Sequence, residues 1–171
     1  AYNSLKKIFQ SPSFLKEDAI IASAKVIADY SNQLKKEDLA KIVDLLVKEA
    51  DEILEKYPEK YLLLVYKGQL ENLSATWDEK SSLKAEETFK KAVSLAPFFP
   101  QPRIFYIKLL LENGETEKAK TQIEEILKLN PDIPEINYFS YIILESEGKK
   151  EEALNYLVKA IEGGIQISNI N

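Results

Sequence analysis

Apolar and polar residues recur along this chain with the spacing of amphipathic α-helices. In the segment 115–130, Ala119, Ile123 and Ile126 lie on one helical face, and lysines and glutamates occupy the other. No segment shows the two-residue alternation that is typical of a half-buried strand. The pattern therefore predicts an all-α protein, with further amphipathic helices at 13–34, 36–58, 82–95 and 149–162.

The segment 101–113 has a different pattern, because it is apolar nearly all round. A helix of this kind is buried on most sides. Equivalent inner helices are predicted at 59–73 and 135–147. Gly114 and Gly148 directly follow two of the three inner helices, and we expect each glycine to end its helix with a positive φ.

A period of 34 residues connects these helices. Ala85, Ala119 and Ala153 follow one another at this spacing, and the same spacing separates Gly114 from Gly148 and Pro97 from Pro131. A fixed period of this length indicates stacked helical hairpins, since one hairpin cannot bury its apolar face alone. We predict a single domain over 1–171 with eight helices in four antiparallel hairpins after a short N-terminal turn. The hairpins are a degenerate one at 13–58 and repeats at 59–99, 100–133 and 134–164.

The small residues predict how each hairpin packs. Ala85 and Ala92 allow the two helices of a hairpin to approach closely, and Phe89 fills the space between them. Pro97 then breaks the chain, so that the next hairpin can stack on the first.

The small, large apolar and proline residues at the repeated positions resemble the tetratricopeptide repeat (TPR) pattern. The resemblance is clearest over 59–162 and weaker over 13–58. The resemblance implies a right-handed solenoid of antiparallel helix pairs that binds a protein or peptide on its concave face. The family has a small residue midway along the inner helix, whereas this chain has Ile107 and Tyr141 there. The matching positions are the small Ala85, Ala92, Ala119, Ala153 and Ala160, the large Phe89, Ile123 and Leu157, and the prolines Pro97 and Pro131.

A narrower resemblance concerns the order of the segments. A degenerate helical pair precedes YLLLVYKGQLENL, an insertion and then KAEETFKKAVSLAPFFPQPR. This order is similar to the repeat segment that follows the membrane region in bacterial O-antigen ligase and polymerase-like proteins. The resemblance implies an extracytoplasmic accessory domain of a glycan-assembly protein, with catalysis in another part of that protein. The chain contains no methionine, which is expected of a processed chain or a fragment of a larger protein.

Composition excludes several kinds of chemistry. The 171 residues include no histidine and no cysteine, so imidazole bases, thiol nucleophiles and the usual zinc ligands are absent. The net charge of −5 disfavours a nucleic-acid partner, because proteins that bind phosphate backbones present a basic face. No apolar run is long enough to insert directly into a membrane. We therefore predict no catalytic residue, no metal and no cofactor.

The candidate binding site is a groove lined by the inner helices. Ile104, Lys108 and Leu111 share one face of their helix at helical spacing. We expect apolar and aromatic side chains, two charges and two amides to hold a protein or an extended or helical peptide there. The alternative is that several of these side chains only pack between hairpins. The predicted groove consists of Gln69, Asn72, Ile104, Lys108, Leu111, Tyr138, Ile142 and Glu145.

Other features have simpler interpretations. The paired acids Glu86-Glu87, Glu124-Glu125 and Glu151-Glu152 recur on outer helices among lysines, which favours a solvated face over glycosidase chemistry. Arg103 lies off the groove face, so the carboxylate clamp of one TPR subset is not expected. Trp77 either anchors a partner or covers the end of its hairpin. Asn72-Leu73-Ser74 is a weak match to a glycosylation acceptor. Ile165, Ile167 and Ile170 suggest that a further repeat or an interface follows.

The sequence favours a non-catalytic scaffold that binds a protein or peptide. The alternative is the accessory domain of a membrane glycan-assembly protein. A cytoplasmic location is expected if the chain is free-standing, and an extracytoplasmic one if it is part of that membrane protein. Neither the partner nor the oligomeric state follows from the sequence.

Overall fold

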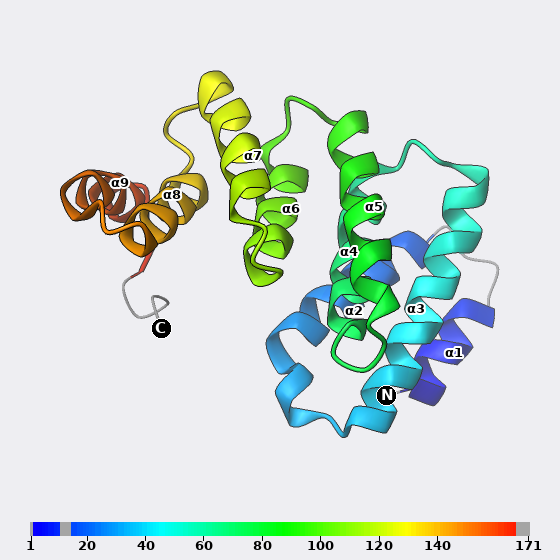
Figure 1. Ribbon diagram of the computed structural model, residues 1–171. Coiled ribbons are helices and arrows are strands. Elements are labelled where there is room, and N and C mark those ends of the chain that lie inside the picture. Colours follow the sequence, from blue (N-terminus) through cyan, green and yellow to red (C-terminus); the bar gives the residue numbers. More distant parts are fainter. Residues whose placement is uncertain (1, 11–14, 167–171) are drawn as a thin grey trace. The chain divides into compact units, whose positions relative to one another are not determined.

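A computed structural model describes residues 2–10 and 15–166 of the chain (Figure 1). Within these residues the secondary structure is entirely helical. The α-helices are α1 (Tyr2–Gln10), α2 (Lys16–Tyr30), α3 (Lys36–Lys56), α4 (Tyr61–Ser74), α5 (Lys80–Leu95), α6 (Pro100–Glu112), α7 (Thr116–Leu129), α8 (Pro134–Ser146) and α9 (Lys150–Glu162), with a short 3-10 helix, η1 (Ser31–Gln33), after α2.

All the predicted helices are present, and their ends lie close to the predicted ones. The expectation of a short N-terminal turn is wrong, because the described part of that segment forms α1. The helix forms since Phe9 is buried, at 5% exposure, and α1 contacts α3. The first two residues of the predicted helix 13–34 lie outside the described residues, and α2 begins at Lys16.

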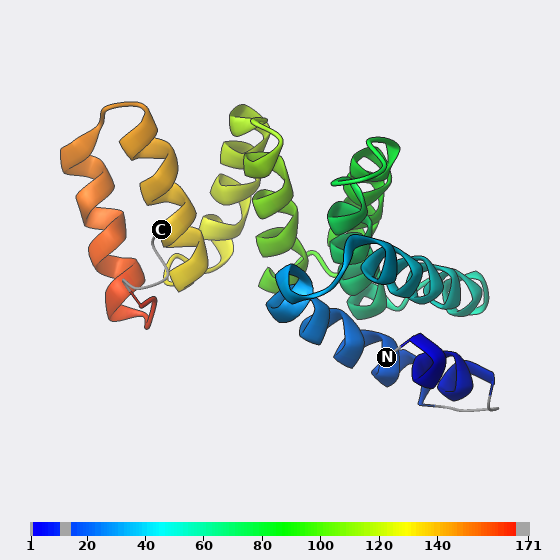
Figure 2. The same cartoon turned by 90° about the horizontal axis from the view of Figure 1, so that it is seen from below.

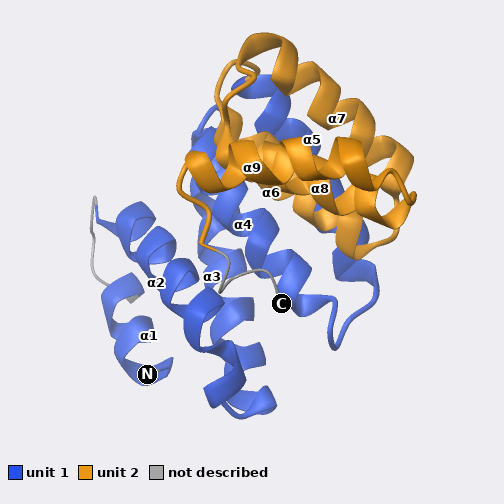
Figure 3. Ribbon diagram, turned by 90° about the vertical axis from the view of Figure 1, so that its left-hand side faces the viewer, with its two compact units in different colours: residues 1–96 blue, residues 97–171 orange. Residues whose placement is uncertain are grey.

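The chain divides into two compact units, residues 1–96 and 97–171 (Figure 3). Unit 1 contains α1 to α5, and unit 2 contains α6 to α9. The prediction of a single domain did not anticipate this division, and it stays a prediction.

In unit 1, α4 is the central helix. It packs along α5 and also contacts α2 and α3. Because it has neighbours on several sides, its side chains are buried nearly all round, including Leu63, Leu64, Val65 and Leu70. This agrees with the apolar pattern that predicted an inner helix.

The contact between α4 and α5 depends on small residues, as predicted. Ala85 and Ala92 of α5 have no exposed surface, and Phe89 between them is 1% exposed. The ring of Phe89 lies against Gly68 of α4, where a Cβ atom would be only 2.8 Å from Cε1 of the ring. Gly68 therefore supplies the small residue that the TPR pattern places midway along an inner helix.

Unit 2 consists of two helix pairs, α6 with α7 and α8 with α9. Figure 2 shows that the helices of each pair lie side by side and run in opposite directions. Ala119, Ala153 and Ala160 have no exposed surface, so the alanine pattern also marks close packing here. Ile107 of α6 is completely buried, at the position in the repeat that Gly68 occupies in α4.

The turns of unit 2 confirm the predicted roles of the glycines. Gly114 has a φ of 74° and Gly148 a φ of 76°. After α6, Gly114 N–H donates to the carbonyl of Leu111, and Glu115 N–H donates to that of Leu110 at 2.8 Å. This is the Schellman arrangement, in which a residue with positive φ satisfies the last carbonyls of a helix. The turn after α8 repeats it.

Candidate functional site

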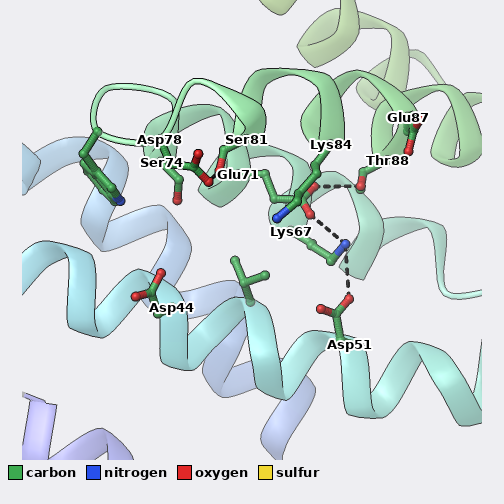
Figure 4. A pocket seen from close by; sticks show the side chains of 12 residues that line it. Asp44, Asp51, Lys67, Glu71, Ser74, Asp78, Ser81, Lys84, Glu87 and Thr88 are labelled. Atoms are coloured by element: carbon green, nitrogen blue, oxygen red, sulfur yellow. Dashed lines mark hydrogen bonds and ion pairs between the residues drawn. The ribbon is translucent and has the colours of Figure 1, made fainter.

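A cavity of about 530 Å³ opens on unit 1 between α3, α4, α5 and the connection from α4 to α5 (Figure 4). Each helix contributes side chains at helical spacing, so one stripe of each helix faces the cavity. We call it the α3–α5 pocket. Its lining residues are Asp44, Val47, Asp51, Lys67, Glu71, Ser74, Trp77, Asp78, Ser81, Lys84, Glu87 and Thr88.

One end of the α3–α5 pocket is occupied by a network that joins the three helices. Lys67 Nζ lies 2.8 Å from a carboxylate oxygen of Glu71 and 3.2 Å from one of Asp51. The Thr88 hydroxyl donates to the other oxygen of Glu71 at 2.7 Å. Glu71 and Thr88 are buried, at 4% and 8% exposure. The buried carboxylate is therefore compensated by a cation and a hydroxyl, as a buried charge requires.

The environment keeps Lys67 protonated. Burial alone would lower the pKa of Lys67, but the hydrogen bond to Glu71 and the negative charges of Glu71 and Asp51 outweigh it and raise the pKa above 10.5. A lysine that acts as a nucleophile needs a lowered pKa instead. The geometry thus favours a structural and electrostatic role for this amine.

The remaining wall of the pocket offers mainly acceptors, and Lys84 of α5 is its one further cation among the lining residues. The hydroxyls of Ser74, Ser81 and Thr88 donate their only proton to the Leu70 carbonyl, to Asp78 and to Glu71, respectively. Carboxylates only accept when they are ionised. The pocket is lined by five carboxylates and two lysines, so it is negatively charged. Such a wall suits a cationic group that donates hydrogen bonds.

The carboxylates of the pocket are spread over its wall. Among residues 2–10 and 15–166, no group of three or more acidic side chains is placed to hold a metal ion. The acids are therefore separate acceptors for hydrogen bonds.

Unit 2 has a smaller cavity, of about 240 Å³, between α7, α8 and α9. Its floor is apolar, with Ile123, Leu127 and Ile143, and ion pairs cross its rim. Glu147 pairs with Lys120 of α7, and lies 2.8 Å from Lys149. The hydrogen bonds from Lys120 and then Lys149 lower the pKa of Glu147 to about 2. These exposed pairs join α7 to the end of α8.

The predicted groove residues lie on three inner helices. Gln69 and Asn72 are half-buried on α4 of unit 1. The side-chain nitrogen of Gln69 is buried and has no hydrogen-bond partner. The six other groove residues belong to unit 2, where α6 and α8 contact each other.

On α6 and α8, the groove residues differ in their exposure. Lys108 is exposed and its amine lies 3.8 Å from Glu112, one turn along α6. Ile142 and Glu145 of α8 are also exposed. Three groove residues are half-buried: Ile104, Leu111 and Tyr138.

The ring of Tyr138 belongs to an aromatic cluster on α8. Its centroid lies 6.0 Å from that of Tyr141 and 6.4 Å from that of Phe139. Aromatic side chains of this kind supply large contact areas at binding surfaces. Tyr141 was not among the predicted groove residues, although its spacing of three from Tyr138 was a usable signal.

Arg103 is engaged within its own hairpin. It is buried, and its guanidinium donates to Gln122 at 2.6 Å and to Glu125 at 2.5 Å. Both partners are on α7, so Arg103 ties the two helices of one hairpin together.

One interpretation of the sequence needs correction. The paired acids are not all solvated, because Glu86 is buried at 8% exposure and pairs with Lys90 of the same helix at 2.8 Å. In the possible glycosylation motif, the acceptor Asn72 is half-buried and Ser74 is buried, both within α4. Trp77 is half-buried and lines the α3–α5 pocket, next to the end of its hairpin.

The α3–α5 pocket itself was missed by the sequence analysis. Lys67 and Glu71 are four residues apart on a helix that was interpreted as apolar, and Thr88 lies on the next helix. The spacing of Lys67 and Glu71 was the available signal for an ion pair. The contributions of α3 were not recognisable, because the 13–58 segment lacks the 34-residue period.

No family model and no curated protein sequence matches the chain. Solved structures do match it. A thermophilic TPR protein of Thermus thermophilus, TTC0263, is 18% identical, with a TM-score of 0.60 over 96% of this chain and 92% of that one. The chain has the fold of TPR proteins.

Other structures with the TPR-like fold agree. A crystal structure of MamA is 15% identical and has a TM-score of 0.66, over 95% of this chain and 85% of that one. A second MamA structure, from MSR-1, is 18% identical and has a TM-score of 0.55, over 87% of this chain and 94% of that one. The predicted fold class is thereby confirmed. The narrower resemblance to O-antigen ligase and polymerase-like proteins finds no support in these comparisons.

No helix in the described part of the TPR-like chain combines the length and apolarity needed to span a membrane.

Proposed function

We propose that this chain is a non-catalytic scaffold that binds a protein or peptide. The observation that carries the proposal is the surface of α6 and α8, two contacting helices that present Ile142, Lys108 and Glu145 to solvent. Half-buried Ile104, Leu111 and Tyr138 provide apolar contacts on the same helices. A surface with apolar anchors and exposed charges is suited to a polypeptide partner. Gln69 and Asn72 belong to α4 of unit 1, and their part in partner binding stays a prediction of the sequence.

The role of Lys108 gives a direct test. We expect Lys108→Glu to weaken partner binding, because it reverses a charge on the proposed surface. Affinity capture from native cells, followed by titration of the purified partner, measures the effect. A loss of about tenfold is expected for a charge contact of this kind.

Lys128→Glu is the matched control. Lys128 is an exposed lysine near the end of α7, so the control makes the same charge change on an outer helix. A partner that is lost with Lys108→Glu and retained with Lys128→Glu supports the proposal. Equal affinity of the wild type and Lys108→Glu contradicts it.

The accessory-domain alternative is favoured by no structural observation and stays a prediction. It is tested by the sequence that precedes Ala1 in the gene. Several membrane-spanning segments there would support the alternative, and their absence would contradict it.

A further inference from the structure

We infer that the α3–α5 pocket receives a basic side chain, arginine or lysine, of the bound polypeptide. The inference rests on the proposed function and adds the chemistry of the ligand and a second binding site. The Lys67 network occupies one end of the pocket and leaves the other end open.

Two carboxylates face this open end. Figure 4 shows Asp44 on α3 and Asp78 on the opposite wall, at the end of the pocket away from Asp51. No described residue pairs with Asp44, whereas Asp78 accepts hydrogen bonds from the Ser81 hydroxyl and from Lys80 N–H. At the other end, by contrast, Asp51 and Glu71 are already paired with Lys67.

The pocket also has apolar groups for the stem of a long basic side chain. Trp77 and Val47 are both half-buried and line the cavity. An indole attracts a guanidinium or ammonium group through its π face, and methylene groups pack on apolar surface. A cavity of about 530 Å³ has room for such a side chain together with water.

The chemistry of the wall selects an organic cation. A metal ion is disfavoured, since no described group of acids is placed to bind one. An anionic group would be repelled by Asp44 and would meet hydroxyl oxygens that have already donated their protons. A neutral group would leave the charge of Asp44 uncompensated. A basic side chain pairs with the carboxylates and stacks on Trp77.

Trp77 provides a reporter, because it is the one tryptophan of the chain. Its indole N–H gives a single signal in a ¹H–¹⁵N spectrum of the full chain. The probes are a capped glycine–arginine peptide, the glycine–lysine equivalent, and a peptide with citrulline in place of arginine. Citrulline keeps the shape of arginine but carries no charge.

We expect the arginine and lysine peptides to shift the Trp77 indole signal and the citrulline peptide to leave it unmoved. Asp44→Asn is expected to weaken binding by roughly threefold to tenfold, the size of one partly screened charge contact. The control is Glu55→Gln, which removes the charge of another exposed acid of α3 that does not line the pocket. Its affinity for the arginine peptide should equal that of the wild type.

Each contrary result identifies what has failed. Equal binding of the citrulline peptide, or an unchanged affinity in Asp44→Asn, overturns the pocket assignment. If free spermidine binds more tightly than either peptide, the cation that the pocket receives does not come from a polypeptide. An unmoved Trp77 signal with shifts in α6 and α8 overturns the pocket and leaves the proposed function standing. If the pocket binds the arginine and lysine peptides, but the captured partner binds Lys108→Glu as tightly as the wild type, then the proposed binding surface on α6 and α8 is wrong and the pocket assignment stands.

Discussion

At the scale of single residues, the close approach of α4 and α5 depends on a glycine, which has no side chain. Gly68 has no Cβ atom, and the Phe89 ring occupies the space that one would fill. Ala85 and Ala92 on either side of the ring have no exposed surface. A protein interior packed this closely responds to the addition of a single methyl group.

We predict that Gly68→Ala destabilises the chain. Alanine normally stabilises a helix relative to glycine, by about 1 kcal/mol. Here the added methyl would lie 2.8 Å from the Phe89 ring. Overpacking is therefore expected to outweigh the gain in helix propensity and to lower the free energy of unfolding by about 1–3 kcal/mol. Urea unfolding followed by circular dichroism measures the difference. Ser94→Ala, at an exposed position of α5, is the control, and a Gly68→Ala variant as stable as that control would contradict the packing account.

The alanine positions were predictable from the sequence, whereas the polar residues of the core were not. A repeat period identifies residues that occupy the same structural place in each hairpin, so Ala119 and Ala153 could be assigned together. The burial of Glu86 does not recur at the equivalent positions of α7 and α9, where Lys120 and Leu154 stand. Its exposure depends on neighbours that belong to unit 1 alone.

At the scale of elements, helix ends were predicted from glycines and confirmed by backbone geometry. Gly114 and Gly148 both have positive φ, and a Cβ atom at either would meet no neighbour within 4 Å. Any cost of substitution at these turns therefore comes from the backbone, since no side chain is displaced.

We predict that Gly114→Ala costs about 1–2 kcal/mol, the penalty of a left-handed backbone for a residue with a Cβ atom. Gly114→Asn should cost less, because asparagine tolerates this conformation. Thermal melts of both variants test the ordering. Equal losses for alanine and asparagine would show that the turn does not depend on its φ.

The Lys67 network joins three helices of unit 1, and we predict that the loss of stability on its removal depends on pH. Glu71→Gln takes away the charge that Lys67 and Thr88 share, and a loss of about 1–3 kcal/mol is expected for a buried donor left poorly paired. Glu87→Gln, an exposed acid of α5, is the control.

The pH dependence follows from the raised pKa of Lys67. Its stabilising contribution is fully present below the ordinary value of 10.5 and is lost as the pH rises through the higher value of the folded state. The gap in stability between the wild type and Glu71→Gln should stay constant from about pH 7 to about pH 10 and shrink above that range. A gap that closes already at neutral pH would contradict the assignment of the charges.

At the scale of the whole molecule, the all-α fold and the repeated helix pairs were predictable, because periodicity and turn residues agree over residues 59–162. The division into residues 1–96 and 97–171 was not, since it depends on contacts between helices and not on local pattern. The candidate binding sites, likewise, could be predicted only in part. Groove residues could be proposed from helical spacing, but the α3–α5 pocket required α3, which carries no repeat signal.

The central claim is that the α6 and α8 surface holds a polypeptide partner. The most direct measurement is photo-crosslinking in native cells, with a photoreactive amino acid at Ile142 of α8 or, as a control, at Leu154 of α9. Both side chains are exposed, at 37% and 58%, and both belong to unit 2. The account predicts a discrete protein adduct from position 142 that Lys108→Glu diminishes, and none from position 154. An adduct from position 154 alone would contradict it.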